Sequence, residues 1–339
     1  MGGNALNVTT VRLSKADFLR VTDIVLSVLQ NHFPSASVSA IPAYRQKQDF
    51  GDLDVLLSYD NDIPHDISIL KSIAKKHFNA TCFFHNASIL SFDYRDSVSS
   101  PAFQIDIIQT PFDCFDFSLN YFSWNDLGNL MGRIAHKMGF SFGHLGLRYS
   151  FFVGNDQKYA SILVCKSFQK SLEFLGYDYS RFSHGFDSLL DIFNFVVSSP
   201  FFNSRIFLLE NRNVKSRTRD RKRKTYMQFL EFCSQNSHLP EFEYHEKSVY
   251  LDLAFQYFQD FEPAYRKVEF DYDRERRAKA IFNGENVSEW TGLRTIKLGQ
   301  LMAAFRKSFE NKEQMYDFIL ENGEVAVRTR ISRIRSHTI

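Results

Sequence analysis

Three aspartates carry the most informative chemistry in this sequence. Asp52 and Asp54 stand one residue apart and open an apolar run that continues through 55–57. If the run is a β-strand, successive side chains alternate between its faces, so both carboxylates lie on one face, roughly 6–7 Å apart. A second apolar segment, 103–108, contains the lone acid Asp106. Three carboxylates on neighbouring strands suit two hard divalent cations, the arrangement used for phosphoryl and nucleotidyl transfer.

The simpler interpretation of Asp52 and Asp54 is a surface hairpin with alternating acids. A metal site is favoured because Gly51 allows a phosphate to approach the backbone, and because the apolar residues after Asp54 imply burial, where unpaired acids are costly. We therefore predict Asp52, Asp54 and Asp106 as catalytic residues and as ligands of two Mg²⁺ ions, with Mn²⁺ as a substitute. Asp52 and Asp54 would bridge both ions, while Asp106 would bind the nucleophile-side ion and help to accept the proton.

The segments around these acids predict a mixed α/β fold. Ser14 can cap an amphipathic helix over 14–33, and apolar spacing predicts a second helix over 67–78. Short apolar runs predict strands at 38–41, 52–57, 81–84, 88–94 and 103–108.

The later part of the chain is predicted to be mainly helical. Helices are expected over 124–138, 159–174 and 186–197, with a glycine-punctuated return to strand at 139–147. Beyond residue 200 the expected helices are 221–234, 249–261 (stopped near Pro263), 298–309 and 314–321. We expect a catalytic domain over 1–200 and a helical, basic extension over 201–339 that binds nucleic acid.

Composition excludes several classes of protein. The 339 residues contain four widely spaced cysteines and ten histidines without metal-ligand spacing, so neither a disulfide framework nor a structural zinc site is expected. No run of eighteen apolar residues and no signal-peptide pattern is present, so we expect a cytoplasmic protein without a membrane partner. No obligate protein partner is predicted.

A run of lysine and arginine over 212–224 concentrates positive charge in a chain whose net charge is only +2. A solvated helix face is the plainer interpretation, but beside a nucleotidyl-transfer site the run would contact a phosphate backbone. Tyr226 and Phe229 follow it, either as core residues or as platforms for bases. The predicted nucleic-acid contacts are Lys215, Arg217, Arg219, Arg221, Lys222, Arg223 and Lys224.

Several motifs, in order along 12–200, resemble the catalytic domain of family X DNA polymerases such as polymerase beta. The GDxDVLL strand (51–57) follows a Tyr44-Arg45 loop, and the third aspartate lies in a Phe-Gln-Ile-Asp-Ile strand (103–107). Leu119-Asn120-Tyr121-Phe122 resembles that family's YFTG turn, and 191–195 resembles its DIFDYI helix. The resemblance implies a polymerase-beta-like nucleotidyltransferase palm and nucleotide-binding subdomain.

The resemblance also implies roles for individual residues. Asp52, Asp54 and Asp106 would be the metal ligands. The residues implied in nucleotide binding are Arg45 and Arg12 at the phosphates, Gly51 through its backbone amide, Tyr121 and Phe122 beside the sugar, and Asp126 and Asn129 near the base. Arg133 would lie near the templating strand.

Two departures from the family pattern affect the nucleotide pocket. Ile41-Pro42 replaces the family's Gly-Ser before the arginine loop, which removes a phosphate-holding hydroxyl that Gln46 or Lys47 would have to replace. Trp124 stands in place of the YFTG glycine, so the turn beside the sugar must differ.

A weaker resemblance concerns the C-terminal part, where 282–302 is similar to the helical arm of CCA-adding RNA nucleotidyltransferases. The sequence therefore predicts a two-metal enzyme that adds a nucleoside monophosphate from an NTP or dNTP to the 3′-hydroxyl of DNA or RNA, releasing pyrophosphate. One alternative is a template-independent RNA 3′-end nucleotidyltransferase. Another is a non-catalytic nucleic-acid-binding protein with a decayed site.

Overall fold

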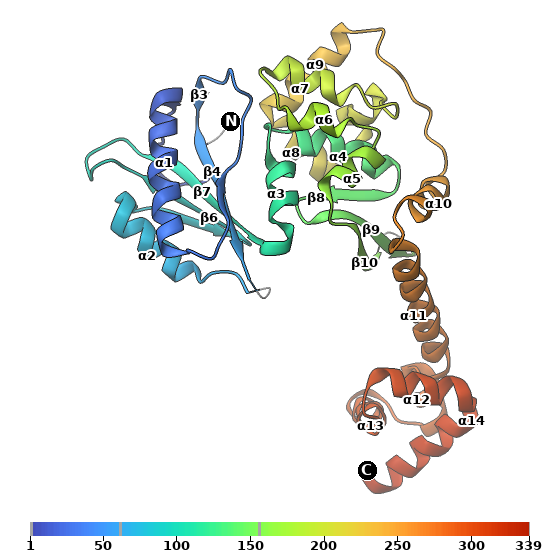
Figure 1. Cartoon of the computed structure of the whole chain (residues 1–339). Helices are drawn as coiled ribbons and strands as arrows, with labels where there is room; N and C mark the ends of the chain where they lie inside the picture. Colours follow the sequence, from blue (N-terminus) through green and yellow to red (C-terminus); the bar gives the residue numbers. More distant parts are fainter. Residues whose placement is uncertain (1–2, 61–62, 155–156, 339) are drawn as a thin grey trace. The chain divides into compact units, whose positions relative to one another are not determined.

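The computed structural model describes residues 3–60, 63–154 and 157–338. The chain divides into two compact units after Phe261. The first is mixed α/β and the second is helical, as the sequence predicts (Figure 1). Among the described helices, none is long and apolar enough to cross a membrane.

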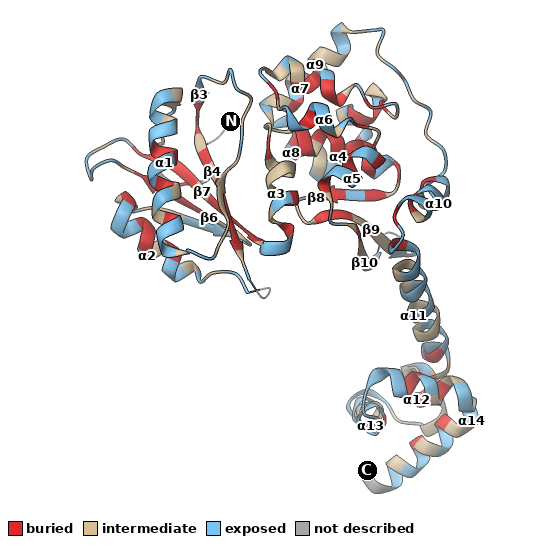
Figure 2. Cartoon of the chain, in the orientation of Figure 1, coloured by how far each residue is buried: buried red, intermediate tan, exposed pale blue. Residues whose placement is uncertain are grey.

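A five-stranded sheet carries the three aspartates. Its strands run in the order β2-β4-β7-β6-β5, and only the central pair, β4 and β7, is parallel. The bounds are β2 Val38–Ala40, β4 Asp52–Tyr59, β7 Phe103–Pro111, β6 Ile89–Tyr94 and β5 Phe83–Asn86. Burial is densest along β4, β7 and β6 (Figure 2).

Two helices cover one face of this sheet. Helix α1 (Lys15–His32) begins where Ser14 accepts a hydrogen bond from the Asp17 amide, and α2 (Ile67–Phe78) begins at the Asp66 cap. Both pack on the alternate residues of the central strands that share a face, among them Leu53, Val55, Leu57, Ile105 and Ile107. Because side chains alternate along a strand, the acids between these residues point to the other face.

The remainder of the first unit is a second layer of helices around a small antiparallel sheet, β8 Phe140–Gly143, β9 Gly146–Val153 and β10 Gln157–Cys165. Its helices are α3 Phe115–Phe122, α4 Leu127–Lys137, α5 Phe168–Phe174, α6 Tyr179–Ser183, α7 Leu189–Val196, α8 Val214–Arg221, α9 Lys224–Gln235 and α10 Lys247–Tyr257. The short elements of this unit are β1 Leu13–Ser14, β3 Asp49–Phe50, and the 3₁₀ turns η1 Phe112–Cys114, η2 Ser204–Phe207 and η3 Leu209–Asn211.

The second unit has its own apolar core. It contains α11 Phe261–Ile281, α12 Gly284–Thr291, α13 Thr295–Lys307 and α14 Lys312–Thr338. Leu301, Phe305, Ile319 and Val327 are fully buried in that core. Helix α14 is interrupted at Gly323, whose φ of 71° a side-chain-bearing residue rarely adopts.

Two sequence predictions about elements are wrong. The helix expected over 159–174 is mostly strand β10, because its apolar run pairs antiparallel with β9, and helix begins only at Phe168. Pro263 does not stop a helix but lies in the first turn of α11, where a missing N–H leaves no hydrogen bond unmade.

The expected domain boundary at residue 200 is also displaced. Helix α9 packs back onto the first unit, where Phe229 lies 5.3 Å from Phe193, measured between ring centroids. The Tyr226 hydroxyl donates to the Phe207 carbonyl at 2.6 Å. Tyr226 and Phe229 are both fully buried, so they are core residues and the compact unit continues to Phe261.

Candidate active site

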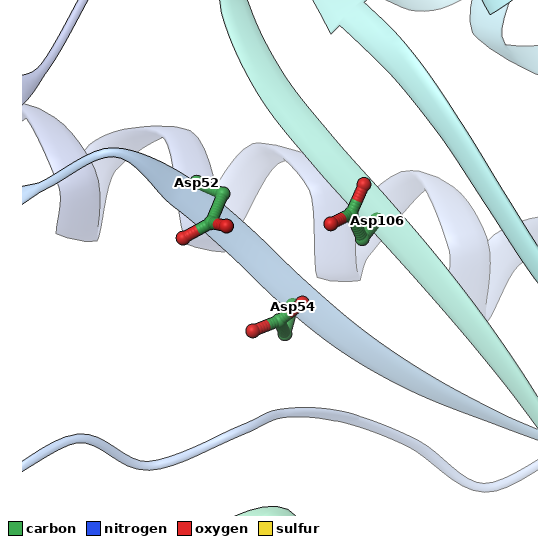
Figure 3. A group of neighbouring side chains, drawn as sticks. All are labelled: Asp52, Asp54 and Asp106. Carbon is green, nitrogen blue, oxygen red and sulfur yellow. The ribbon is translucent and has the colours of Figure 1, made fainter. Parts of the chain in front are cut away.

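The three aspartates converge on the sheet face that α1 and α2 leave free. In the parallel register of β4 with β7, Asp54 lies opposite Asp106 and Asp52 lies opposite Gln104. One carboxylate oxygen from each aspartate lies within 4.8 Å of the others (Figure 3). The cluster predicted from strand alternation is therefore present, and the parallel pairing of the two strands produces it.

The three neighbouring carboxylates repel one another, and burial disfavours the charged forms of Asp54 and Asp106. Burial raises the pKa of Asp54 well above its usual range, and the neighbouring Asp52 and Asp106 raise it further. Burial also raises the pKa of Asp106, although hydrogen bonds from Ser91 and Gln104 oppose this. The Gln104 Nε2 atom donates to both Asp106 oxygens, at 3.0 and 2.9 Å, which fixes the orientation of that carboxylate. A divalent cation would relieve the repulsion between the three groups.

Lys47 is the cation that faces this cluster. Burial lowers the pKa of Lys47, and Asp52 and Asp54 oppose that change. Its Nζ atom lies 4.6 Å from the centre of the Phe50 ring. This cation–π contact holds the amine close to the start of β4. Lys47 also lines the cavity at the acidic strand.

A cavity of about 570 Å³ opens at the acidic strand. Asp52, Asp54 and Gly51 line one side of it, and Lys222, Arg223 and Lys224 line another. The lining also includes Arg12, Lys47, Phe122, Asn125 and Asp126. The end of the basic run therefore meets the acidic cluster across one cavity, which the sequence could not show for residues about 170 positions apart.

The junction between α8 and α9 brings the basic residues to this cavity. Arg223 is the N-terminal boundary residue of α9, and its guanidinium forms an ion pair with Asp126 at the start of α4. Elsewhere in the run, Arg217 donates to the Arg212 carbonyl and Arg219 donates to Asn129. Lys215 and Arg221 are exposed and lie outside the cavity lining.

The two arginines expected at the phosphates have different surroundings. Arg12 lines the cavity, where its Nε lies 2.6 Å from Asp49. Arg45 is not part of the lining, because its guanidinium pairs with Asp187 and with the His184 carbonyl. The structure therefore does not bear out Arg45 as a phosphate contact, and its ion pair instead joins the loop before β3 to the segment before α7.

The residues expected near sugar, base and template separate into two groups. Phe122 and Asp126 line the cavity, whereas Tyr121 and Asn129 line a second, smaller one beside α4. Arg133 is only 9% exposed, and its Nη2 donates to the Ile206 carbonyl at 2.9 Å. The role of Arg133 as a template contact stays a prediction, and in the structure its guanidinium is engaged by η2.

The two departures from the family pattern contact one another. The Trp124 amide donates to the Pro42 carbonyl at 2.8 Å, and Trp124 adopts a φ of 64°. Its indole ring packs edge-on against Phe186, 5.6 Å away between ring centroids. Ile41 and Pro42 line the cavity, and Trp124, which is not part of the lining, is held to Pro42 by this hydrogen bond.

Asn125 is a cavity residue that sequence reasoning missed. Its Oδ1 atom is buried and has no hydrogen-bond partner among the residues that the structure describes. Its φ of 63° is one that asparagine tolerates better than most residues. Asn125 itself was a usable signal in the sequence, because asparagine is favoured at turn positions that need a positive φ.

No protein-family model matches the chain, and no curated protein matches it. The function must therefore be inferred from the chemistry of the site.

Proposed function

We propose that this protein is a two-metal nucleotidyltransferase that transfers a nucleoside monophosphate from a nucleoside triphosphate to the 3′-hydroxyl of a nucleic acid. The observation that carries the proposal is the three-aspartate cluster, of which Asp52 and Asp54 line a cavity that Lys222, Arg223 and Lys224 also line. Carboxylate oxygens are the ligands that Mg²⁺ prefers, and the raised pKa of Asp54 indicates a site that favours an added cation. A positive wall facing that cluster suits a triphosphate.

In the proposed reaction the 3′-oxygen bonds to the α-phosphorus while the bond to the pyrophosphate oxygen breaks. Bound Mg²⁺ supplies two effects, a lowered pKa of the attacking hydroxyl and neutralisation of the leaving pyrophosphate. Asp52, Asp54 and Asp106 hold the cations, and Asp106 helps to accept the hydroxyl proton. Lys47, Lys222 and Lys224 bind the triphosphate, and Phe122 lies beside the sugar.

Template-independent transfer is the form of this activity that one observation favours. Arg133, the residue expected near a templating strand, lies under η2, and Asn129 is paired with Arg219. A templating base would have to displace both contacts to reach α4. We therefore expect a single-stranded acceptor, RNA rather than duplex DNA, in line with the resemblance of the C-terminal part.

Replacing Asp52 and Asp54 together by asparagine tests the proposal. We expect transfer of label from an α-³²P-labelled NTP to fall at least about 1,000-fold, equivalent to about 4 kcal/mol of transition-state stabilisation. The assay uses each NTP and dNTP with Mg²⁺ or Mn²⁺, and offers tRNA, single-stranded DNA and a primed template as acceptors.

Asp60→Asn is the matched control, because Asp60 is an exposed acid just beyond the other end of β4. Its activity should stay within about threefold of wild type, since no charge changes at the cluster. Undiminished transfer by the double variant would show that the metal ligands are misassigned. Salt-dependent binding of nucleic acid without any metal-dependent turnover would support the non-catalytic alternative.

A further inference from the structure

The second cavity, beside α4, is small and basic. It has a volume of about 280 Å³, near the lower end for ligand pockets. No carboxylate lines it in the part of the chain that the structure describes. Its polar lining includes Asn129, Arg133, Arg212, Asn213, Ser216 and Arg219.

Arg212 is the strongest sign that this cavity takes a ligand. Its side chain is 3% exposed, and its Nη2 lies 2.7 Å from Asp220. Its Nε and Nη1 atoms are buried without a hydrogen-bond partner among the described residues. A buried donor left unpaired costs about 1–3 kcal/mol, and more on a charged group. Two such donors on one guanidinium call for an acceptor in the adjoining cavity.

Other donors converge on the same space. The Asn129 Nδ2 atom is buried and unpaired within the described chain, because Arg219 uses only the Oδ1 atom of that side chain. Asn213 caps α8, accepts a hydrogen bond from the Ser216 amide at 2.9 Å, and lies with Ser216 in the lining. The first turn of α8 therefore adds the positive end of a helix dipole to the cavity.

The balance of charge favours an anion. Arg133, Arg212 and Arg219 contribute three positive charges, and Asp220 partly offsets those of Arg212 and Arg219 through its two oxygens. His136 also lines the cavity, and burial lowers its pKa, with further lowering by Lys247 and Lys137. His136 is therefore a neutral neighbour, and the arginines set the sign of the local potential.

We propose that this second cavity binds a phosphate group, held by Arg212 and Arg219 with Asn129 as a further donor. A phosphate offers several acceptor oxygens and suits the forked donors of arginine. The group would belong either to a free nucleotide or to the backbone or end of a nucleic acid. The site is separate from the three-aspartate cluster, and phosphate binding there does not require the proposed transfer reaction.

Ser216 allows a test that leaves the buried Arg212–Asp220 pair intact. Replacing Arg212 would leave the buried Asp220 without one of its two arginine partners and could unfold the protein. Ser216 is the third residue of α8, a position where glutamate and glutamine both favour the helix. Ser216→Glu therefore adds a negative charge at the cavity, and Ser216→Gln is a neutral control of the same size.

Binding to the full-length protein is measured by calorimetry in EDTA with inorganic phosphate, AMP, and a short RNA with either a 5′-phosphate or a 5′-hydroxyl. We expect Ser216→Glu to weaken phosphate binding at least about tenfold, and Ser216→Gln to stay within about threefold of wild type. Asp60→Asn, at a residue that lines neither cavity, should retain this binding.

The outcomes separate the sources of the phosphate. Tighter binding of AMP than of RNA supports a nucleotide site, and a preference for the RNA supports a nucleic-acid contact, through its end if the 5′-phosphate is required. Equal weakening by the two Ser216 variants would overturn the proposal. So would a wild-type protein that binds none of the four probes, because solvent alone would then satisfy Arg212.

Discussion

At Asp54, burial and two neighbouring carboxylates all disfavour the charged form of the side chain. It lies opposite Asp106 in the β4–β7 register and one residue from Asp52 on the same strand face. The positive charge of Lys47 reduces this repulsion, yet burial lowers the pKa of Lys47 itself. One partly desolvated amine cannot balance three carboxylates, so the site gains stability from an added divalent cation or from a bound proton.

The raised pKa of Asp54 predicts a specific pH dependence of stability without metal. Because folding raises this pKa, the native state binds a proton that the unfolded chain releases. The unfolding free energy of the wild type should therefore fall as the pH rises above the usual 3.8 towards the raised value. Asp54→Asn removes this loss, so at neutral pH in EDTA its Tm should exceed that of the wild type by at least ~2 °C, corresponding to about 1 kcal/mol.

The stability advantage of Asp54→Asn should shrink as the pH approaches 3.8. Mg²⁺ should raise the Tm of the wild type and have little effect on the variant, because a ligand stabilises only the state that binds it. Thermal melts followed by circular dichroism measure both effects. A variant less stable than the wild type at neutral pH in EDTA would contradict the repulsion inferred at this cluster.

Helix α4 borders both cavities. Asp126 precedes its first turn and lines the first cavity, while Asn129, one turn on, lines the second. Arg223 and Arg219 of the basic run pair with these two residues. The run is therefore not one uniform nucleic-acid surface: its end serves the first cavity, its middle contacts α4, and Lys215 and Arg221 face solvent.

This division of the basic run can be tested with two double variants of equal charge change. Lys222→Gln/Lys224→Gln should lower kcat/KM for the NTP about 10- to 100-fold, because two positive charges leave the cavity wall. Lys215→Gln/Arg221→Gln should change it less than about threefold, since neither residue lines that cavity. Steady-state kinetics at fixed acceptor concentration distinguish the two. Equal losses would indicate a general electrostatic effect of the whole run.

Among the described residues, each of the two units has a hydrophobic core of its own. The first joins the sheet to α1 and α2, and the second lies entirely within α11–α14. Every residue that lines the two cavities precedes Phe261. Among the described residues, none of the second unit lines either cavity, and we propose that this unit contacts the acceptor.

A chain shortened to residues 1–261 tests this separation. We expect it to fold and to bind an NTP with Mg²⁺ within about threefold of the full chain, because the first cavity is complete without the second unit. Its affinity for an RNA acceptor should fall about tenfold or more as that contact is lost. Calorimetry measures both affinities, and circular dichroism confirms folding. A folded fragment unable to bind the NTP would refute the separation.

Local sequence pattern predicted the strands of the sheet and the shared face of Asp52 and Asp54, whereas the pairing of β4 with β7 brings Asp106 to them. The alternation of Asp52, Leu53 and Asp54 assigns faces without any long-range information, and Ser14 caps α1 as its residue type predicts. Local pattern failed at β10, because a short apolar run does not distinguish a strand from a helix. There the pairing with β9 decides the conformation.

The surroundings of the cluster depend on contacts between distant parts of the chain. Arg45, Arg133 and the end of the basic run have different surroundings, namely Asp187, η2 and the first cavity. A side chain's charge is a property of its residue type, and strand alternation is a property of neighbouring residues. Burial, pairing and access to a cavity arise only when segments separated in sequence meet, so they follow from the tertiary structure.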